Sequence, residues 1–454
     1  MVAGKPERMT NPHPPDCQFV PPWLLERLAE PTDRATLTAD LVGRAVAETL
    51  RTDAEIRAAR AAKAPSAPSR ATKAAWAVYT ASSTQNLPGT LLRTAGDPAN
   101  ADPAVNEAAT GGQAALDMYS QVYGRRSYDD AGAEVIMSVH YGVRYDNAFW
   151  NGTQLVFGDG DGQVFDRFTK PIDVLGHELT HAVTERTAGL VYSGEPGALN
   201  ESMSDVFGIC SKQRLLGQTA QQADWLIGEG IFLPGVQARA LRDMAHPGTA
   251  YDDPRLGKDP QVGSYADFVH TTQDNGGVHI NSGIPNRAFQ LAATAIGGSS
   301  AEGAGRIWYA ALTGTDVGPN TDFAGFAAAT VAAAGPHADA VRQAWTTVGV
   351  TPAAGGSRAG GPGAAPRTVA VTRSGGFAGI TRAGELDLEG DDPRVDDVRR
   401  LVQRADFTTL STRPPTPDAF SYTFSLPERD EVTVAEHDLT HDLRRLVELL
   451  LDKE

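Results

Sequence analysis

Cysteine is almost absent from this chain of 454 residues, which carries only Cys17 and Cys210. A framework of disulfide bonds is therefore excluded, and a hydrophobic core has to stabilise the fold. The chain also lacks any run approaching the ~20 apolar residues that a membrane span requires. Its first residues lack the apolar segment of roughly 7–15 residues that marks a signal peptide. We expect a protein with no membrane partner that is cytoplasmic or secreted by a non-classical route.

Basic residues are outnumbered, with 40 Lys and Arg against 56 Asp and Glu and a net charge of −16 at pH 7. Contacts with nucleic-acid phosphates need clustered Lys and Arg, so this balance argues against a nucleic-acid partner. The hydrophobic fraction of 41% is ordinary for a globular protein. The length indicates more than one domain.

Composition divides the chain into four regions. Residues 1–70 begin with prolines, continue through a run that favours one or two helices, and end in a Pro- and Ser-rich connector typical of a cleavable site. Residues 71–350 carry short apolar runs and turns up to about 172, and helical patterns from 173. Residues 351–366 contain almost only Ala, Gly, Pro, Ser and Thr, which is typical of a linker. Residues 367–454 again mix strand and helix patterns.

The whole pattern predicts an α+β fold. The expected strands are 75–79, 135–141, 154–157, 369–371 and 422–426, and the expected helices are 173–189, 200–216, 283–296, 396–405 and 439–451.

The sequence His177-Glu178-Leu179-Thr180-His181 is the strongest chemical signal. Residues four apart lie on one face of a helix, so both imidazoles can bind one metal ion, while Glu178 projects beside it and can act as a base. This pattern is a zinc signature of metallopeptidases. A chance match on an ordinary helix is the alternative, and the surrounding residues decide between the two.

A catalytic zinc site needs a third protein ligand and one position left for water. Glu201 lies in the next helical pattern, and a turn expected at 194–197 allows an antiparallel helix pair that brings Glu201 to the metal. Asp205 follows one turn later and is placed to accept the second ring N–H of a zinc-binding histidine, which fixes the orientation of the ring. Either carboxylate taken alone would more often be a solvated helix residue.

Amide hydrolysis also requires hydrogen-bond donors at the developing oxyanion. The glycine-rich segment 274–283 contains His279 at the start of a helical pattern, and Tyr192 lies nine residues before Glu201. Taken alone, His279 would more often be a capping residue and Tyr192 a core residue.

Together these motifs resemble the thermolysin family of zinc endopeptidases. The resemblance covers residues 75–350 and is carried by the stretches 147–152, 173–205 and 274–283. It implies a β-rich N-terminal lobe and a helical C-terminal lobe with one zinc ion between them. It implies that His177, His181 and Glu201 hold zinc and that Glu178 is the general base. Tyr192 and His279 would stabilise the oxyanion, with Asp274 orienting His279. Asn147 and Ala148 would bind the peptide main chain, and Arg242 would hold the carbonyl beyond the scissile bond.

The resemblance also implies an apolar pocket for the residue after the cut. Its members are Phe165, Phe168, Val174, Ile227, Ile231 and Leu241. We therefore predict an endopeptidase that acts on peptides or proteins and cleaves before Leu, Phe, Ile or Val. Two other classes stay open as alternatives: a binding or scaffold protein built on an inactive protease, and a metallo-aminopeptidase with a similar ligand set.

Members of this family commonly bind calcium beside the zinc helices. Asp173, Asp224 and Glu229 match acidic positions of that site, whereas Lys212 and Leu226 replace two others. The remaining carboxylates are too few for a double calcium site, although a single weakly bound calcium ion stays open. We expect the Lys212 ammonium to take the position of the cation and to pair with the same acids.

Both ends of the chain resemble regulators. Residues 19–25 resemble the propeptide of the protealysin branch, which covers the cleft and is removed by cleavage; a disordered tail with one hydrophobic patch is the alternative. Residues 369–379 resemble emfourin, an inhibitor of protealysin-like proteases. We predict inhibition within the chain by a turn that consists of Arg373, Ser374, Gly375, Gly376 and Phe377. The alternative is a proteolytically silent precursor whose C-terminal domain is a binding or docking module.

Overall fold

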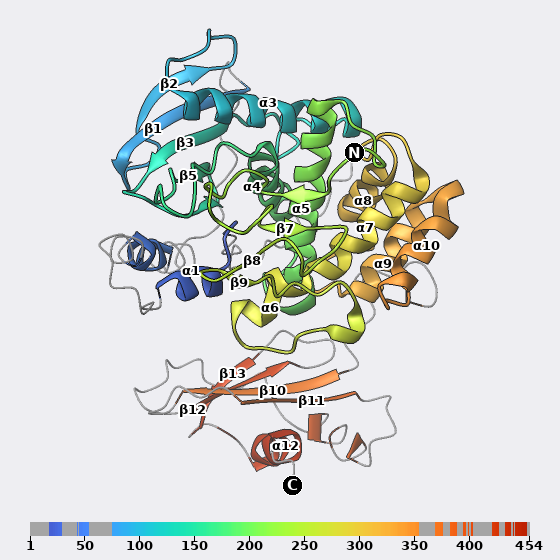
Figure 1. Cartoon of the computed structure of the whole chain (residues 1–454). Helices are drawn as coiled ribbons and strands as arrows, with labels where there is room; N and C mark the ends of the chain where they lie inside the picture. Colours follow the sequence, from blue (N-terminus) through green and yellow to red (C-terminus); the bar gives the residue numbers. More distant parts are fainter. Residues whose placement is uncertain are drawn as a thin grey trace, which may run out of the picture. The chain divides into compact units, whose positions relative to one another are not determined.

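The computed structural model of the chain contains two compact units, residues 1–359 and 360–454 (Figure 1). Their boundary falls within the predicted linker. The residues that the structure describes are 18–29, 43, 45–53, 75–353, 368–375, 382–387, 394–395, 398, 401–402, 420–425, 432–436, 439 and 441–451. Cys17 and the predicted connector at 64–70 lie outside them.

A five-stranded mixed sheet forms the β-rich lobe of the first unit. Its order is β2 (Thr90–Thr94), β1 (Trp76–Thr84), β3 (Val135–Tyr141), β5 (Leu155–Phe157) and β4 (Ala148–Trp150). β1, β3 and β5 are mutually parallel, and β2 and β4 are antiparallel to their neighbours. The short strand β4 therefore lies at the edge of the sheet, where its outer side can pair with an extended peptide.

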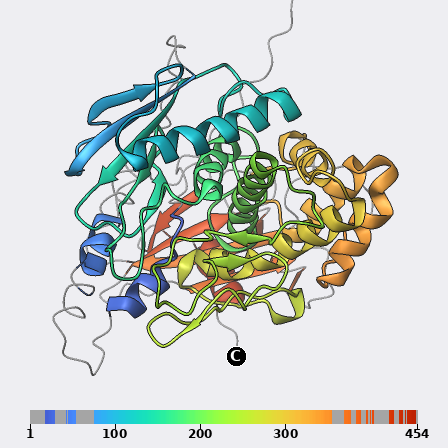
Figure 2. The ribbon, with the colours of Figure 1, turned by 45° about the horizontal axis from the view of Figure 1, so that its top comes forward.

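A long helix in the β-rich lobe corrects the expectation of strands and turns alone. α3 spans Pro103–Tyr123, begins at the N-cap Asp102 and packs on the sheet and on α4 (Figure 2). Its pattern is weakened by Gly111 and Gly112, which disfavour a helix interior. Packing explains both glycines. A Cβ atom on Gly111 would lie 2.7 Å from Leu175, and one on Gly112 would lie 2.6 Å from Met137.

Two long helices carry the predicted metal ligands. α4 spans Ile172–Glu185 and α5 spans Gly194–Leu216, and they lie side by side in the middle of the first unit (Figure 2). The turn expected at 194–197 is wrong, because these residues form the first turn of α5. Pro196 is accommodated there, where a backbone N–H has no partner within the helix.

The helices α4 and α5 approach closely at Gly176 and Gly208. A Cβ atom on Gly176 would lie 2.9 Å from the Cα atom of Gly208, and one on Gly208 would lie 2.7 Å from the carbonyl oxygen of Asp173. Small residues at a crossing point allow such an approach, and it brings the side chains of the two helices within reach of one ion.

The remaining elements of the first unit form its second lobe, which is mostly helical. They are β6 (Leu226–Ile227), β7 (Arg242–Asp243), β8 (Asp252–Asp253), β9 (Gly257–Lys258), η1 (Tyr265–Asp267), α6 (Asp274–Asn281), α7 (Gly283–Ile296), α8 (Ala304–Thr313), α9 (Phe323–Ala333), η2 (Gly335–His337) and α10 (Ala338–Thr347). The range expected for α7 is confirmed. Ile227 pairs with Arg242 across β6 and β7, so the predicted pocket and the predicted carbonyl-binding arginine share one ladder.

The N-terminal segment, described at residues 18–29 and 45–53, belongs to the core of the first unit. It contains α1 (Pro22–Ala29) and a second helical stretch at 45–53. Phe19, Val20, Leu24 and Leu25 are completely buried in the same hydrophobic cluster as the sheet and helices of this unit. The alternative of a disordered tail is therefore wrong for these residues.

The second unit has its own sheet and core. The antiparallel order is β11 (Arg382–Asp387), β10 (Thr368–Gly375), β12 (Phe420–Ser425) and β13 (Val432–Ala435), with α12 (His441–Leu451) contributing to the same hydrophobic cluster. The predicted turn is corrected here, because Arg373, Ser374 and Gly375 belong to β10 and pair with β12. Gly376 and Phe377 lie outside the described residues.

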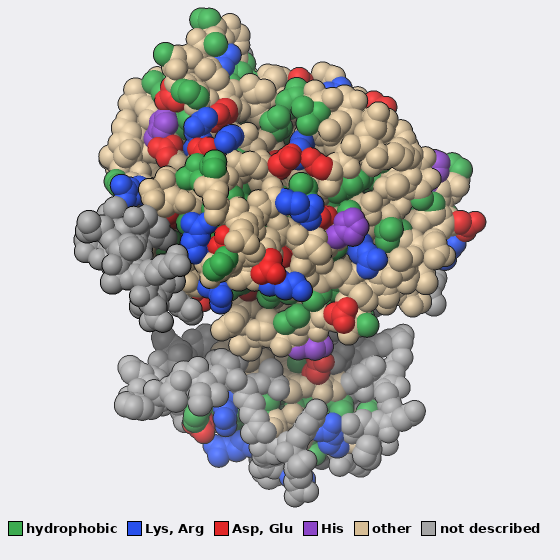
Figure 3. All heavy atoms as spheres, viewed as in Figure 1, with side chains coloured by type: hydrophobic (Ala, Val, Ile, Leu, Met, Phe, Trp, Pro, Cys, Tyr) green, Lys and Arg blue, Asp and Glu red, His purple; other side chains and the backbone are tan. Residues whose placement is uncertain are grey.

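The surface of the first unit mixes both signs of charge. On the face in view, acidic and basic side chains are interspersed (Figure 3). Among the described helices, none combines the length and apolarity that crossing a bilayer requires.

Candidate metal centre and substrate cleft

His177 and His181 on α4 and Glu201 on α5 converge at one point inside the first unit. Their side chains are at most 1% exposed. The two Nε2 atoms lie 3.0 Å apart, and the Glu201 carboxylate oxygens lie 3.6 Å from His177 Nε2 and 3.5 Å from His181 Nε2. Among the described residues these three form the group with metal-binding geometry.

The outer ring nitrogens show why this arrangement suits a cation. His177 Nδ1 lies 2.9 Å from Asp205 Oδ1, and His181 Nδ1 lies 2.9 Å from Asn200 Oδ1. Asn200 donates its amide to the carbonyl of Leu190, which orients its oxygen toward His181. Both Nδ1 atoms therefore carry hydrogen, and in neutral rings the two Nε2 lone pairs face one another beside a carboxylate.

Lone pairs so close repel one another unless a positive ion lies between them. Two imidazole nitrogens and one carboxylate oxygen, with room for water, are the ligand set of catalytic zinc. The residues present therefore fit zinc. The sequence interpretation missed Asn200, which orients the His181 ring, although it directly precedes Glu201.

Asp205 connects the metal centre with the substrate cleft. It accepts hydrogen bonds from Arg242 Nε at 2.8 Å, Arg242 Nη2 at 2.7 Å and Asn286 Nδ2 at 2.8 Å, besides its contact with His177. Burial raises the pKa of Asp205, but Arg242 and His177 outweigh burial and hold the pKa well below its usual range. Asn286, on α7, is a further partner of Asp205, and no sequence pattern identifies it.

The residues predicted to face the oxyanion lie together beside Glu201. Tyr192 donates its hydroxyl to Glu201 Oε1, and its oxygen lies 3.3 Å from His279 Nε2. Asp274 Oδ1 lies 2.6 Å from His279 Nδ1, while Asp274 Oδ2 accepts from the His279 backbone at 2.9 Å. Burial lowers the pKa of His279, but Asp274 and Glu201 outweigh burial and raise it to about 9.

The turn before His279 needs glycine because its backbone is in the left-handed region. Asn275, Gly276 and Gly277 have φ angles of 50°, 88° and 75°, in the left-handed region that favours glycine. Glu178 lies one residue beyond His177 on α4 and is fully buried. The structure thus places Tyr192 and His279 beside Glu201 and puts Glu178 on the helix that carries His177 and His181, and their catalytic roles stay predictions.

The predicted main-chain binding residues contact the N-terminal segment. Gln18 forms an antiparallel bridge with Phe149 of β4, and Phe19 N donates to the carbonyl oxygen of Ala148 at 3.1 Å. Val20 N donates to Asn147 Oδ1 at 2.8 Å, and Asn147 Nδ2 donates back to the carbonyl of Val20 at 3.3 Å. The segment therefore pairs with the edge strand as an extended peptide would.

The side chain of Phe19 lies among the predicted pocket residues. Its ring centre is 6.5 Å from that of Phe168 and 5.2 Å from that of His177, and the Arg242 guanidinium lies 4.8 Å from it. Gly228 leaves room for the ring, because a Cβ atom there would lie 3.2 Å from Phe19. The six predicted pocket residues are at most 2% exposed and share one cluster with Phe19; they are Phe165, Phe168, Val174, Ile227, Ile231 and Leu241.

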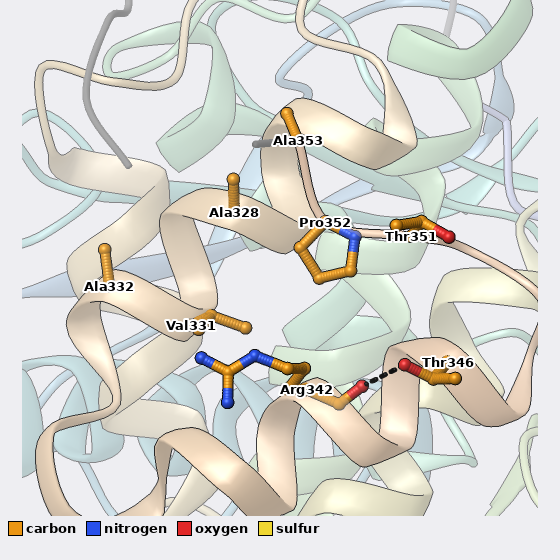
Figure 4. Close-up of a pocket in the computed structure, with 8 residues that line it drawn as sticks. All are labelled: Ala328, Val331, Ala332, Arg342, Thr346, Thr351, Pro352 and Ala353. Carbon is orange, nitrogen blue, oxygen red and sulfur yellow. Dashed lines mark hydrogen bonds between the residues drawn. The ribbon is translucent and has the colours of Figure 1, made fainter. Parts of the chain in front are cut away.

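A separate cavity of about 410 Å³ lies between α9, α10 and residues 351–353 (Figure 4). Small side chains such as Ala328 and Ala332 line it with Val331 and Arg342. The Arg342 guanidinium is paired with Asp339 at 2.8 Å. No predicted catalytic residue is among the lining residues of this cavity.

The predicted calcium positions surround Lys212 of α5. Lys212 Nζ lies 2.9 Å from Glu229 Oε2, 3.2 Å from Asp224 Oδ1 and 3.1 Å from the carbonyl of Leu226. Asp173 is buried nearby and accepts from the backbone of Gly228. Burial lowers the pKa of Lys212, but the acids outweigh burial and raise it, so the ammonium stays charged. The expected pairing is confirmed for Asp224 and Glu229, Asp173 acts on Lys212 through its charge, and the calcium content stays a prediction.

The fold and these residues define a metallopeptidase with a two-histidine, one-glutamate centre. Family comparison agrees, since residues 64–185 match the thermolysin metallopeptidase catalytic domain and residues 188–350 match its alpha-helical domain. The chain belongs to the thermolysin family, in its protealysin-like branch, and is a metalloendopeptidase. Residues 371–451 match emfourin, so an emfourin domain is fused at the C-terminal end.

Individual relatives support this placement. An extracellular metalloprotease of Pectobacterium carotovorum subsp. carotovorum is 47% identical over 343 residues, covering 74% of this chain and 97% of that protein. Protease PrtS of Photorhabdus sp. (strain Az29) is 41% identical over 339 residues, covering 73% and 91%. The solved precursor of protealysin from Serratia proteamaculans has a TM-score of 0.67 and 46% identity, covering 74% of this chain and all of that one.

Replacing Lys212 tests whether its ammonium substitutes for calcium. Lys212→Met leaves three acids without their cation and should lower the free energy of unfolding by about 2 kcal/mol, measured in urea. Lys212→Glu supplies a bridging carboxylate, so millimolar calcium should stabilise that variant and leave the unaltered protein unchanged. Arg214→Met, nearby on α5, is the control and should change stability by less than about 0.5 kcal/mol. Two firmly held calcium ions in the unaltered protein, found by elemental analysis, would contradict this assignment.

Proposed function

We propose that this chain is the precursor of a zinc endopeptidase that hydrolyses peptide bonds before hydrophobic residues. The observation that carries the proposal is the convergence of His177, His181 and Glu201 beside an apolar pocket that accepts Phe19. When bound at these ligands, zinc would lower the pKa of a water molecule and polarise the scissile carbonyl.

The protein groups would divide the remaining work. Glu178 takes a proton from the attacking water and passes it to the leaving amine. Tyr192 and His279 donate hydrogen bonds to the developing oxyanion. Asn147 and Ala148 align the substrate along β4, and Arg242 holds the carbonyl that follows the cut. A metallo-aminopeptidase is disfavoured, because residues 64–185 and 188–350 match the two domains of the thermolysin metallopeptidases.

The N-terminal segment acts as an inhibitory propeptide in this proposal. Phe19 fills the pocket that a substrate needs, and Val20 uses both groups of the Asn147 amide. Asp53, from the second helical stretch, accepts hydrogen bonds from Tyr145 and from the same Asn147 at 3.3 Å. Two separate parts of the segment thus engage the residue that would bind substrate.

The emfourin domain supplies a second inhibitory element in this proposal. A linker of about 15 residues has a root-mean-square span of ~20 Å, and tethering at this length gives an effective concentration on the order of millimolar. Modest intrinsic affinity is then enough to occupy the cleft. Arg373 is an unsuitable contact residue, because its guanidinium lies 4.6 Å from the ring of Phe420 within its own sheet. The inhibitory contacts are therefore assigned to the residues after Gly375.

Glu178→Gln should abolish hydrolysis in the enzyme freed of its N-terminal segment. The variant retains all three ligands and should hold one zinc ion, while kcat falls by about 100-fold or more because no base accepts the proton of water. Peptide hydrolysis and elemental analysis measure the two effects. Glu302→Gln, at an exposed position, serves as the control. Substantial residual activity in Glu178→Gln would refute the assigned base.

Cleavage of a peptide library should favour Leu, Phe, Ile or Val directly after the cut. A charged side chain there should lower kcat/KM by at least about 100-fold, because the six pocket residues are apolar and the nearby Arg242 is already paired with Asp205. Mass spectrometry of the products gives the preference at each position. A majority of Asp, Glu, Lys or Arg after the cut would overturn the pocket assignment.

Deleting residues 360–454 should raise the peptidase activity of the enzyme freed of its N-terminal segment. The tethered inhibitor is removed, and the initial rate on a fluorogenic peptide measures the change. Phe377→Ala in the complete second unit should shift the rate in the same direction. If both changes leave the rate unaltered, the second unit is a binding or docking module.

A further inference from the structure

Two hydrogen bonds fix which carbonyl groups of the N-terminal segment face the catalytic residues. His279 Nε2 donates to the carbonyl oxygen of Gln18 at 2.9 Å, and Arg242 Nη1 donates to that of Phe19 at 3.1 Å. In the proposed mechanism, His279 faces the carbonyl under attack and Arg242 faces the next one. Both contacts place the bond between Gln18 and Phe19 at the position of the scissile bond.

The side chains and the strand pairing give the same alignment independently. Phe19 is the residue whose ring fills the pocket assigned to the position after the cut. Its N–H donates to Ala148 of β4, and Gln18 pairs with Phe149 in antiparallel orientation. The segment therefore runs through the cleft in the direction of a substrate, and it is not a reversed plug.

We propose that Gln18–Phe19 is a self-cleavage site and that the cut leaves the inhibition in place. This inference rests on the proposed peptidase activity. Water adds its oxygen to the carbonyl carbon of Gln18, the C–N bond breaks, and Glu178 transfers the proton from water to the nitrogen of Phe19. The products are the carboxylate of Gln18 and a new amino terminus at Phe19, so no further reactant is needed.

The buried anchors of the segment explain why the second product stays in the cleft. Val20, Leu24 and Leu25 are completely buried, and Leu28 is 7% exposed. Releasing α1 would expose these apolar side chains to water, so α1 holds Phe19 in the pocket after the bond is broken. The Arg242 and Asn147 contacts also lie on this side of the cut. The cut chain is therefore expected to remain inactive.

Intact-mass measurement and amino-terminal labelling of the full chain test the inference. Zinc is added to the metal-free protein, samples are denatured at intervals, and chains beginning at Phe19 are counted. We expect this form to accumulate at a rate independent of protein concentration, without a matching rise in hydrolysis of an external peptide. Glu178→Gln should lower its rate of formation by at least about 100-fold. Phe19→Asp should abolish the cut at this bond.

A matched pair of substitutions separates cleavage from release. Leu25→Ala weakens the anchoring of α1. In a chain that also lacks residues 360–454, the cut form of this variant should therefore hydrolyse an external peptide at least about tenfold faster than the cut form that keeps Leu25. Leu92→Ala, an exposed position on β2, should leave the cut form as inactive as before.

Two results would overturn the self-cleavage inference and leave the proposed peptidase function intact. One is the absence of chains beginning at Phe19, while enzyme freed of its N-terminal segment hydrolyses an external peptide. The other is a cleavage rate that grows with protein concentration, because an intermolecular cut does not need the observed alignment. If freed enzyme hydrolyses nothing, the proposed peptidase function itself fails.

Discussion

The close approach of α4 and α5 is the constraint on which the metal centre depends. Gly176 and Gly208 meet where any larger side chain would force the helices apart. At this separation Glu201 comes within 3.6 Å of the imidazole of His177, although the two residues are 24 positions apart in the chain. Interiors pack at crystal-like density, so a shift of one helix cannot be absorbed locally and would move a ligand. The two glycines are therefore as much part of the metal site as the residues that would touch the ion.

Asp205 links the metal centre to the residue that faces the substrate carbonyl. Its carboxylate contacts His177, Arg242 and Asn286, so one buried anion orients a ligand and a substrate-binding cation together. Removing one partner would leave a buried charge uncompensated, which typically costs several kcal/mol. Arg242 keeps Nη1 for the carbonyl of Phe19 because its other groups are held by Asp205. The proposed metal binding and the proposed substrate alignment thus depend on one hydrogen-bond network.

The sequence predicts the catalytic residues more completely than it predicts the fold. Helical spacing was enough to join His177 with His181, and resemblance to a family assigned Glu201, Tyr192 and His279. Sequence alone missed α3, because Gly111 and Gly112 obscure its helical pattern for the sake of packing against Leu175 and Met137. It missed Asn200 and Asn286 because an asparagine that orients a ligand has no periodic signature. Tertiary contacts decide these features, and local propensity does not report them.

In the proposed scheme, the N-terminal segment inhibits through the buried side chains of α1, and not through its alignment with the catalytic residues. Contacts that are equally strong before and after the cut bind the segment in both states, so the cut by itself does not release it. Phe19 and Val20 supply the alignment of a substrate, whereas Leu24 and Leu25 retain the product. Cleavage at Gln18–Phe19 therefore leaves an inhibitor that is still joined to the enzyme. In this proposal, a cut in the connector at 64–70 would end that tether and its high effective concentration, so activation would depend on the second site and not on the first.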